Sequence, residues 1–209
     1  MARTNLDPVA VAVLAKAPIP GLAKTRLIPE IGAHAAAVLQ ERLTERAIEA
    51  AVAADTGPAT LWCAPEIDHF SFQNLAARLP ITLKRQPDGD LGARMLAAIA
   101  AGNCATIVIG TDCPSLDADH LRKAATALCR EAEIVITPAE DGGYVLIGAR
   151  RPHPDLFEAM PWGTHLVLAE TRARLAALRL RAQEFAPLWD VDRPADLARL
   201  EREHADIAV

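Results

Sequence analysis

The sequence predicts an α/β protein, a three-layer α/β/α sandwich with a mostly parallel central sheet. Three observations lead to this expectation. Short apolar runs alternate with helix-forming stretches along nearly all 209 residues. The run Thr106–Ile109 is apolar and β-branched and stops at Gly110, as expected of a strand buried on both faces. With 51% hydrophobic residues, the chain can bury the core of a single domain, residues 1–209.

In the first half of the chain, strands and helices alternate. The segment Val9–Leu14 is interpreted as a buried strand rather than a signal peptide, because Asp7 precedes it. Asp68 is expected to cap a short helix. In chain order, we expect the strand Val9–Leu14, the helix Gly32–Ala54, the strand Ala59–Cys63, the helix Asp68–Leu79, the strand Ile81–Lys84, the helix Ala93–Ala101 and the strand Thr106–Ile109.

The second half continues the alternation around one expected hairpin. Asp117 can cap a helix that runs to Cys129. The Asp-Gly pair at 141–142 lies between two apolar runs, which is typical of a hairpin turn. The remaining elements are expected to be the strands Glu133–Thr137 and Tyr144–Gly148, the helix Leu166–Leu178, the strand Leu180–Phe185 and the helix Pro194–His204.

Composition excludes several functional classes. The net charge is −5 and no long basic block occurs, so a nucleic-acid groove is not favoured. No apolar run is long enough to span a bilayer. The four cysteines form neither C-x-x-C nor a zinc-binding spacing, and reduced thiols in the cytoplasm are the simplest interpretation.

Asp112 is the expected centre of the chemistry. It follows the central strand, and ligands of open α/β sheets bind at the carboxyl ends of such strands. Mg²⁺ needs one or two carboxylates together with phosphate oxygens. Asp112, followed by Pro114, could bind such a cation, although an aspartate in this setting can also simply form a turn.

A basic loop follows the first strand and should therefore lie on the same sheet edge as Asp112. Lys16, Lys24 and Arg26 surround Gly21 and two prolines. Three cations with exposed backbone N–H groups suit phosphates. The loop matches neither the Walker A motif nor G-x-G-x-x-G. The alternative is a solvated loop whose charges only improve solubility.

Four further segments have both a functional and a structural interpretation. Asp192, or Asp190, could provide a second metal ligand, or Asp192 could only cap the helix that starts at Pro194. Paired glycines at 142–143 could let the backbone approach a ligand closely, or form a plain turn. Gln86 could contact a nucleobase, or its segment could be a turn in which Asp90 caps a helix. Trp162 could cover a substrate or be a partly buried loop residue.

Five motifs together resemble a known family. They are A-K-x-P-x-x-G-x-x-K-T-R-L at 15–27, Q-x-x-G-D-L-G at 86–92, G-T-D-C-P-S-L at 110–116, D-G-G-Y-V-L-I-G at 141–148 and D-V-D-x-P-x-D-L at 190–197. This set resembles the radical-SAM/selenodomain-associated transferase family. That family is similar to phospholactate guanylyltransferase and belongs to the glycosyltransferase-A-type nucleotide-diphospho-sugar transferase superfamily.

The resemblance implies a glycosyltransferase-A-like fold, a bound nucleotide and a divalent metal. It assigns catalytic roles to Lys16, Lys24, Arg26 and Asp112, and metal binding to Asp112 and Asp192. The nucleotide-binding residues that it implies are Ala15, Lys16, Gly21, Lys24, Arg26, Gln86, Gly92, Asp112, Gly142 and Gly143.

Two departures from the superfamily pattern bear on the geometry of the phosphate loop and on the reaction. The Gly-Gly of the sugar nucleotidyltransferase loop is replaced by Lys16-Ala17-Pro18. The D-x-D motif of glycosyltransferases is incomplete, because position 110 is glycine and position 114 is proline. The second departure favours nucleotidyl transfer over glycosyl transfer.

The expected function is metal-dependent transfer of a nucleotidyl group from a nucleoside triphosphate to a small phospho- or sugar-like acceptor, with Mg²⁺ or Mn²⁺. A glycosyltransferase that uses a nucleotide-sugar donor is the first alternative, and a non-catalytic nucleotide-binding domain is the second. The expected partners are the nucleotide and an acceptor of unassigned identity. Nucleic acid and membrane are not expected, and a homodimer is the expected form if the chain associates.

Overall fold

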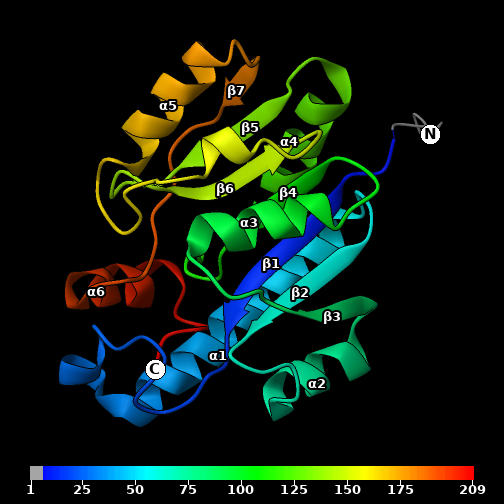
Figure 1. The fold of residues 1–209 in the computed structure, drawn as a ribbon. Coiled ribbons are helices and arrows are strands. Elements are labelled where there is room, and N and C mark those ends of the chain that lie inside the picture. The colour runs from blue at the N-terminus through cyan, green and yellow to red at the C-terminus, as the bar shows by residue number, and fades with distance from the viewer. Residues whose placement is uncertain (1–6) are drawn as a thin grey trace.

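A seven-stranded sheet forms the centre of the computed structural model, which describes residues 7–209 (Figure 1). Its strands are β1 (Ala10–Lys16), β2 (Ala59–Ala64), β3 (Ile81–Arg85), β4 (Thr106–Ile109), β5 (Ile134–Pro138), β6 (Tyr144–Ala149) and β7 (Ala182–Glu184). Their order is β3-β2-β1-β4-β6-β5-β7. Only the pairs that β6 makes, with β4 and with β5, are antiparallel. The predicted mostly parallel sheet is therefore confirmed.

Helices cover both faces of the sheet and complete the three layers. They are α1 (Ile28–Ala54), α2 (Phe70–Arg78), α3 (Leu91–Ala100), α4 (Ala118–Arg130), α5 (Val167–Ala177) and α6 (Pro194–Glu203), with a short 3₁₀ helix η1 (Pro154–Leu156). Helices α1, α2 and α4 pack on one face, and α3 and α5 pack on the other. Helix α6 packs with α1 in a third apolar cluster.

The central strand β4 was predicted with its correct bounds, and the reason lies in its neighbours. Ile107 and Ile109 pack toward α1 and α4, whereas Val108 packs toward α3. All four residues of the strand are buried. Because side chains of a strand alternate between faces, a strand covered on both sides must be apolar throughout.

Two local expectations were wrong. Asp68 does not cap α2: the helix begins at Phe70, and the His69 ring nitrogen accepts the N–H of Ser71 at 3.3 Å. The long helix starts at Ile28 rather than Gly32, because Pro29 suits a first turn and Gly32 (φ 79°) only kinks the helix.

For Asp192, the structure decides between two interpretations that the sequence left open, because Asp192 does not cap α6. The Asp196 carboxylate reaches back to accept the backbone N–H groups of Asp192 at 3.0 Å and Arg193 at 2.7 Å. The side chain of Asp192 is thereby left available for contacts across the site.

Parallel strands bring their carboxyl ends to one edge of the sheet. The loop after β1 (residues 17–27), the turn after β4 (residues 110–117) and the segment after β3 (residues 86–90) therefore all leave the sheet on the same side. Within residues 7–209, no helix is both long and apolar enough to cross a lipid bilayer.

Candidate functional site

The basic loop after β1 contacts the acidic turn after β4. The ammonium of Lys24 donates to Asp112 Oδ1 at 2.6 Å, across 88 positions of sequence. The Lys24 side chain is only 4% exposed, whereas that of Asp112 is 48% exposed. Strand β1 lies directly beside β4 and runs parallel to it, so the loops that follow the two strands are neighbours. The predicted meeting of loop and carboxylate is confirmed.

The segment before α6 completes this edge. The backbone N–H of Val191 donates to the Asp112 carbonyl at 2.8 Å, and Lys24 donates to the Val191 carbonyl at 2.5 Å. One residue further, Asp192 forms an ion pair with Arg26. Both carboxylates predicted to bind metal therefore lie on the same rim, and each contacts a cation of the loop.

Negative charge accumulates around Asp190. Burial, together with the nearby carboxylates of Asp141, Asp112 and Asp192, raises the pKa of Asp190 to about 6. Four acidic side chains from three segments thus face a common region. Such an arrangement costs free energy in the absence of a compensating cation.

This pKa shift predicts a pH-dependent effect of Asp190→Asn. A carboxyl whose folded-state pKa rises from its ordinary 3.8 to about 6 stabilises the fold at low pH and loses that contribution as the pH rises. In metal-free buffer, we expect the variant to gain about 1 kcal/mol over the wild type between pH 4 and pH 7, after allowance for solvent screening. Urea unfolding at four pH values measures the difference. A difference independent of pH would contradict the assignment.

The oxygen donors on this rim have the chemistry that a hard divalent cation requires. Within residues 7–209, no group of three or more His, Cys, Asp or Glu side chains is arranged to bind a metal. Mg²⁺, however, is commonly bound by one or two carboxylates with phosphates and water supplying the rest. The Asp112 carboxylate and the Val191 carbonyl already hold a positive charge, the ammonium of Lys24. The residues present therefore fit a nucleotide-bound Mg²⁺ or Mn²⁺.

A hollow of about 320 Å³ opens beside this rim, over the carboxyl ends of β1, β2 and β3. Lys16, Arg85 and Arg94 give it a positive charge, which only Asp88 offsets. Its other walls are largely apolar. The lining residues are Lys16, Ala17, Ile19, Leu22, Ala64, Pro65, Arg85, Gln86, Pro87, Asp88 and Arg94.

The sequence reasoning missed Arg85 and Arg94. Arg85 is the last residue of β3, and Arg94 lies in the first turn of α3. A cation in the first turn of a helix opposes the helix dipole, so it is unfavourable there without an anionic neighbour or ligand. That position was a signal from which Arg94 could have been identified.

Gln86 lies in the wall of the hollow, but its side chain is already engaged. Its amide nitrogen donates to the carbonyls of Ala15 at 2.9 Å and Trp62 at 2.8 Å. Arg94 Nη1 donates to its amide oxygen at 3.4 Å. The residue ties the ends of β1 and β2 together and orients Arg94. Asp90 caps α3 by accepting the N–H of Ala93 at 2.8 Å, so the structural interpretation of that residue is confirmed.

Two of the predicted binding glycines pack against the segment 157–165. A Cβ on Gly92 would lie 2.7 Å from the Phe157 carbonyl oxygen and 2.8 Å from the Trp162 ring. A Cβ on Gly142, where φ is +94°, would lie 2.4 Å from the carbonyl oxygen of His165. Trp162 is partly buried, and its ring meets that of Tyr144 edge-on at 6.4 Å.

The other two glycines lie in turns. Gly143 donates its N–H to Asp141 Oδ1 at 2.9 Å in the hairpin between β5 and β6, which confirms the predicted turn. Gly21 has φ +85° in the loop after β1, with no atom within 4 Å of a Cβ. Its backbone is therefore open to the surroundings.

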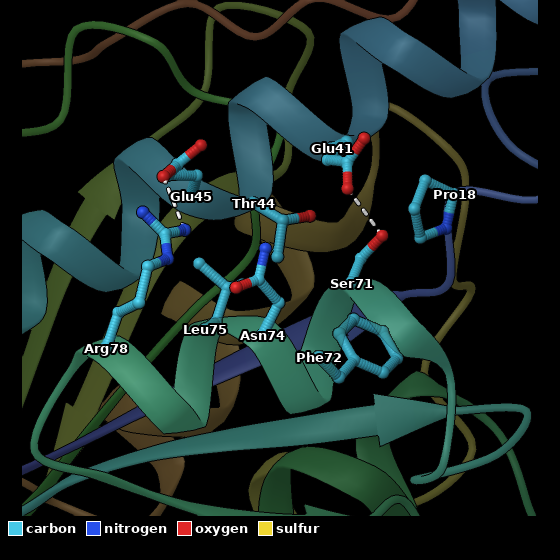
Figure 2. A pocket seen from close by; sticks show the side chains of 9 residues that line it. All are labelled: Pro18, Glu41, Thr44, Glu45, Ser71, Phe72, Asn74, Leu75 and Arg78. Atoms are coloured by element: carbon cyan, nitrogen blue, oxygen red, sulfur yellow. Dashed lines mark hydrogen bonds and ion pairs between the residues drawn. The ribbon is translucent and has the colours of Figure 1, made fainter.

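A smaller hollow of about 50 Å³ lies between α1 and α2 (Figure 2). Its polar groups already pair with one another: Ser71 donates to Glu41 at 2.5 Å, and Arg78 donates to Glu45 at 2.7 Å. Two glutamates make it unsuitable for polyphosphate. The candidate site is therefore the larger hollow together with the rim of Lys24, Arg26, Asp112 and Asp192.

Comparison with known proteins places the chain in a family and a fold. The family described as "Uncharacterized protein conserved in bacteria (DUF2064)" matches residues 47–164. No curated protein matches the sequence. A provisionally named nucleotide-diphospho-sugar transferase from Desulfovibrio desulfuricans G20 has a similar structure, with a TM-score of 0.82 and 26% identity over 94% of this chain and 89% of that protein.

More distant structures share the fold. A nucleotidyl transferase from Methanothermobacter thermautotrophicus matches with a TM-score of 0.64 and 13% identity, over 96% of this chain and 99% of that one. CMP:2-keto-3-deoxy-manno-octonic acid synthetase, solved with CTP, matches with a TM-score of 0.60 and 13% identity over the same shares. The predicted glycosyltransferase-A-like fold is confirmed, and the neighbour at 26% identity is named as a transferase, in agreement with the predicted class of enzyme.

Proposed function

The chain belongs to the DUF2064 family, and from the geometry of its site we propose that it is a metal-dependent nucleotidyltransferase. It would transfer the nucleotidyl group of a nucleoside triphosphate to a small phospho- or sugar-like acceptor and release pyrophosphate. The observation that carries the proposal is the 2.6 Å contact between Lys24 and Asp112. It joins a phosphate-binding type of loop to a metal-binding type of carboxylate at the edge where open α/β sheets bind ligands.

In this proposal, the hollow binds one part of the nucleoside triphosphate and the rim binds the other. The nucleoside lies in the hollow over β1, β2 and β3, between its apolar walls and near Arg85 and Arg94. The triphosphate extends from there toward Asp112. Lys16 lines the hollow at the end of β1 and, in this proposal, contacts the phosphates.

The reaction is an in-line displacement at the α-phosphorus. An oxygen of the acceptor phosphate or hydroxyl forms the new bond, the bond to the bridging oxygen of the β-phosphate breaks, and pyrophosphate departs. Lys16, Lys24 and Arg26 stabilise the charge on the departing group, and the backbone around Gly21 adds N–H donors. Mg²⁺ or Mn²⁺, bound by Asp112 and Asp192, would offset the charge of the phosphate oxygens. Catalysis of this kind depends on positioning and electrostatics.

The motif resemblance to the radical-SAM/selenodomain-associated transferases, and through them to phospholactate guanylyltransferase, supports the same proposal. It suggests a phosphorylated acid or a related small anion as a class of acceptor to test. The cytoplasmic location expected from the sequence belongs to this proposal as well.

Glycosyl transfer is the second candidate, favoured by one observation. The structural neighbour at 26% identity is named as a nucleotide-diphospho-sugar transferase. In that reaction, the anomeric carbon of the donor sugar is attacked and a nucleoside diphosphate leaves. The incomplete D-x-D motif around Asp112 supports nucleotidyl transfer instead.

Ligand screening followed by a product assay tests the proposal. We expect one or more nucleoside triphosphates to raise the melting temperature in the presence of Mg²⁺ or Mn²⁺, and to do so less in EDTA, because ligands that bind the folded state stabilise it. With small phosphorylated and sugar-like acceptors, the chain should then release pyrophosphate. Release of a nucleoside diphosphate from a sugar nucleotide would establish the second candidate. Metal-independent binding without turnover of any donor would identify a non-catalytic nucleotide-binding domain.

A further inference from the structure

Lys24 occupies the oxygen ligands that the proposed function assigns to a metal. We propose that Lys24 is an internal cation that closes the ligand-free site, and that residues 18–26 form a latch which a metal-bound nucleotide must open. This inference rests on the proposed function. It adds a regulatory step, because the same loop blocks the site before binding and contacts the phosphates after it.

The first argument is the coordination of the Lys24 ammonium. Two of its three N–H groups donate to oxygen atoms, Asp112 Oδ1 at 2.6 Å and the Val191 carbonyl at 2.5 Å. Its side chain is 4% exposed. A carboxylate and a carbonyl oxygen are also typical ligands of a hard divalent cation. A lysine held in this way cannot contact a phosphate that approaches from solvent.

The second argument is that occupation by Lys24 and by a metal is mutually exclusive. An ammonium and a divalent cation on the same carboxylate oxygen would repel each other at contact distance. A metal that binds both Asp112 Oδ1 and the Val191 carbonyl oxygen, the two atoms that Lys24 contacts, must therefore displace Lys24. The displaced ammonium would then be close to the incoming phosphates, which are the natural new partners for its charge.

The third argument is that the pairing is repeated along the rim. Arg26 pairs with Asp192, the second proposed metal ligand. Arg26 is 61% exposed, so its ion pair is weak and readily exchanged. The buried contact of Lys24 is accordingly the main closure, and the Arg26 contact supports it.

The fourth argument is that the loop is built to move between fixed ends. Ala17, Ala23 and Leu27 are buried and anchor it to the core, so the movement concerns the segments between these anchors. Between them, residues 20–22 are exposed, and Gly21 has open space around it. Lys24 itself has φ +47°, a left-handed conformation that is unfavourable for a lysine and persists only where its surroundings enforce it. Release of the ammonium would allow this backbone to relax.

Binding of Mn²⁺ alone, without nucleotide, tests the latch by electron paramagnetic resonance. We expect Lys24→Met to bind Mn²⁺ at least about tenfold more tightly than the wild type. If the latch is open in only about one-tenth of the wild-type molecules, the apparent affinity of the wild type is about tenfold below that of the open site. Lys16→Met is the matched control: it removes the same charge from an exposed lysine at the end of β1, just before the same loop. It should change the affinity much less. An equal increase of Mn²⁺ affinity in both variants would mean that only the overall electrostatic potential of the site had changed, which would overturn the latch. No increase in Lys24→Met would overturn it as well.

Two further measurements show whether the change in Mn²⁺ affinity depends on Asp112 and separate a failure of the latch from a failure of the proposed function. Adding Asp112→Asn to Lys24→Met should abolish the gain in Mn²⁺ affinity. In the wild type, hydrogen exchange at residues 18–26 should change most when Mg²⁺ is added with ATP, GTP, CTP or UTP, change less with Mg²⁺ alone, and remain unchanged with nucleotide alone. If the Mn²⁺ results hold but no nucleotide binds, the proposed function fails while the lysine closure stands. If nucleotides bind without a change in loop exchange, the latch fails and the proposed function stands.

Discussion

Asp112→Asn is expected to lower metal-dependent pyrophosphate release by about 10²- to 10³-fold while the protein folds normally. The carboxylate is the central acidic group of the rim and, in our proposal, the principal metal ligand. Asparagine has nearly the same shape and keeps an oxygen within reach of Lys24 and of the Thr111 hydroxyl, which lies 3.2 Å from Oδ1. The charge is therefore removed with little change in packing.

The measurement uses the triphosphate and acceptor that support the fastest turnover in the wild type. Asp119→Asn is the matched control, because Asp119 is exposed on α4 and pairs only locally with Arg122. It should retain full activity. Circular dichroism and thermal unfolding verify that both variants are folded. An Asp112→Asn protein with undiminished, metal-dependent activity would remove Asp112 from the mechanism.

Gly142→Ala is expected to destabilise the fold by about 2–4 kcal/mol, because it combines backbone strain with a clash. Its φ of +94° is accessible mainly to glycine. A Cβ there would lie 2.4 Å from the His165 carbonyl oxygen, and backbone cannot give way as a flexible side chain can. The Gly142 carbonyl also accepts the N–H of Leu168 at 2.9 Å, so the hairpin is tied to the start of α5.

Two other glycines separate the contributions to this effect. Gly163→Ala introduces a positive-φ alanine (φ +77°) with no atom within 4 Å, so it should show the strain alone. Gly110→Ala has neither strain nor a close neighbour and should be nearly neutral. Urea unfolding of the three variants gives the free energies. A loss in Gly142→Ala no larger than that in Gly163→Ala would contradict the role of the close approach to His165.

The elements that could be predicted are those whose cause is local. Strand β4 is apolar because both of its faces are covered, and its four consecutive apolar or β-branched residues are sufficient to predict this. Asp117 caps α4 by accepting the N–H groups of Asp119 at 2.9 Å and His120 at 3.0 Å, a contact within one turn. An error arose where two neighbouring residues could cap the same helix, because His69 and not Asp68 caps α2. The cap of α6 was left open, and Asp196 rather than Asp192 accepts the N–H groups there.

The residues of the candidate site likewise include some that a simple rule predicts and others whose position depends on tertiary packing. The rule that ligands bind at strand ends was sufficient to bring Lys24, Arg26 and Asp112 to one edge. It did not indicate that Arg94 would line the hollow, because that depends on how α3 packs over the sheet. Nor did it indicate that the Gln86 amide would donate hydrogen bonds to the backbone carbonyls of β1 and β2. The partners of a buried polar side chain depend on backbone groups that are distant in sequence.

The sequence by itself determined the alternation of elements, the buried central strand and the sheet edge on which the charged loops lie, because these follow from side-chain pattern and chain direction. Only the tertiary structure decided the position of β6 between β4 and β5, the packing of Gly92 and Gly142 against the segment 157–165, and the burial of Lys24 between Asp112 and Val191. Each of these joins residues that are far apart in the chain. Their geometry is set by the packing of whole elements, which no local pattern encodes.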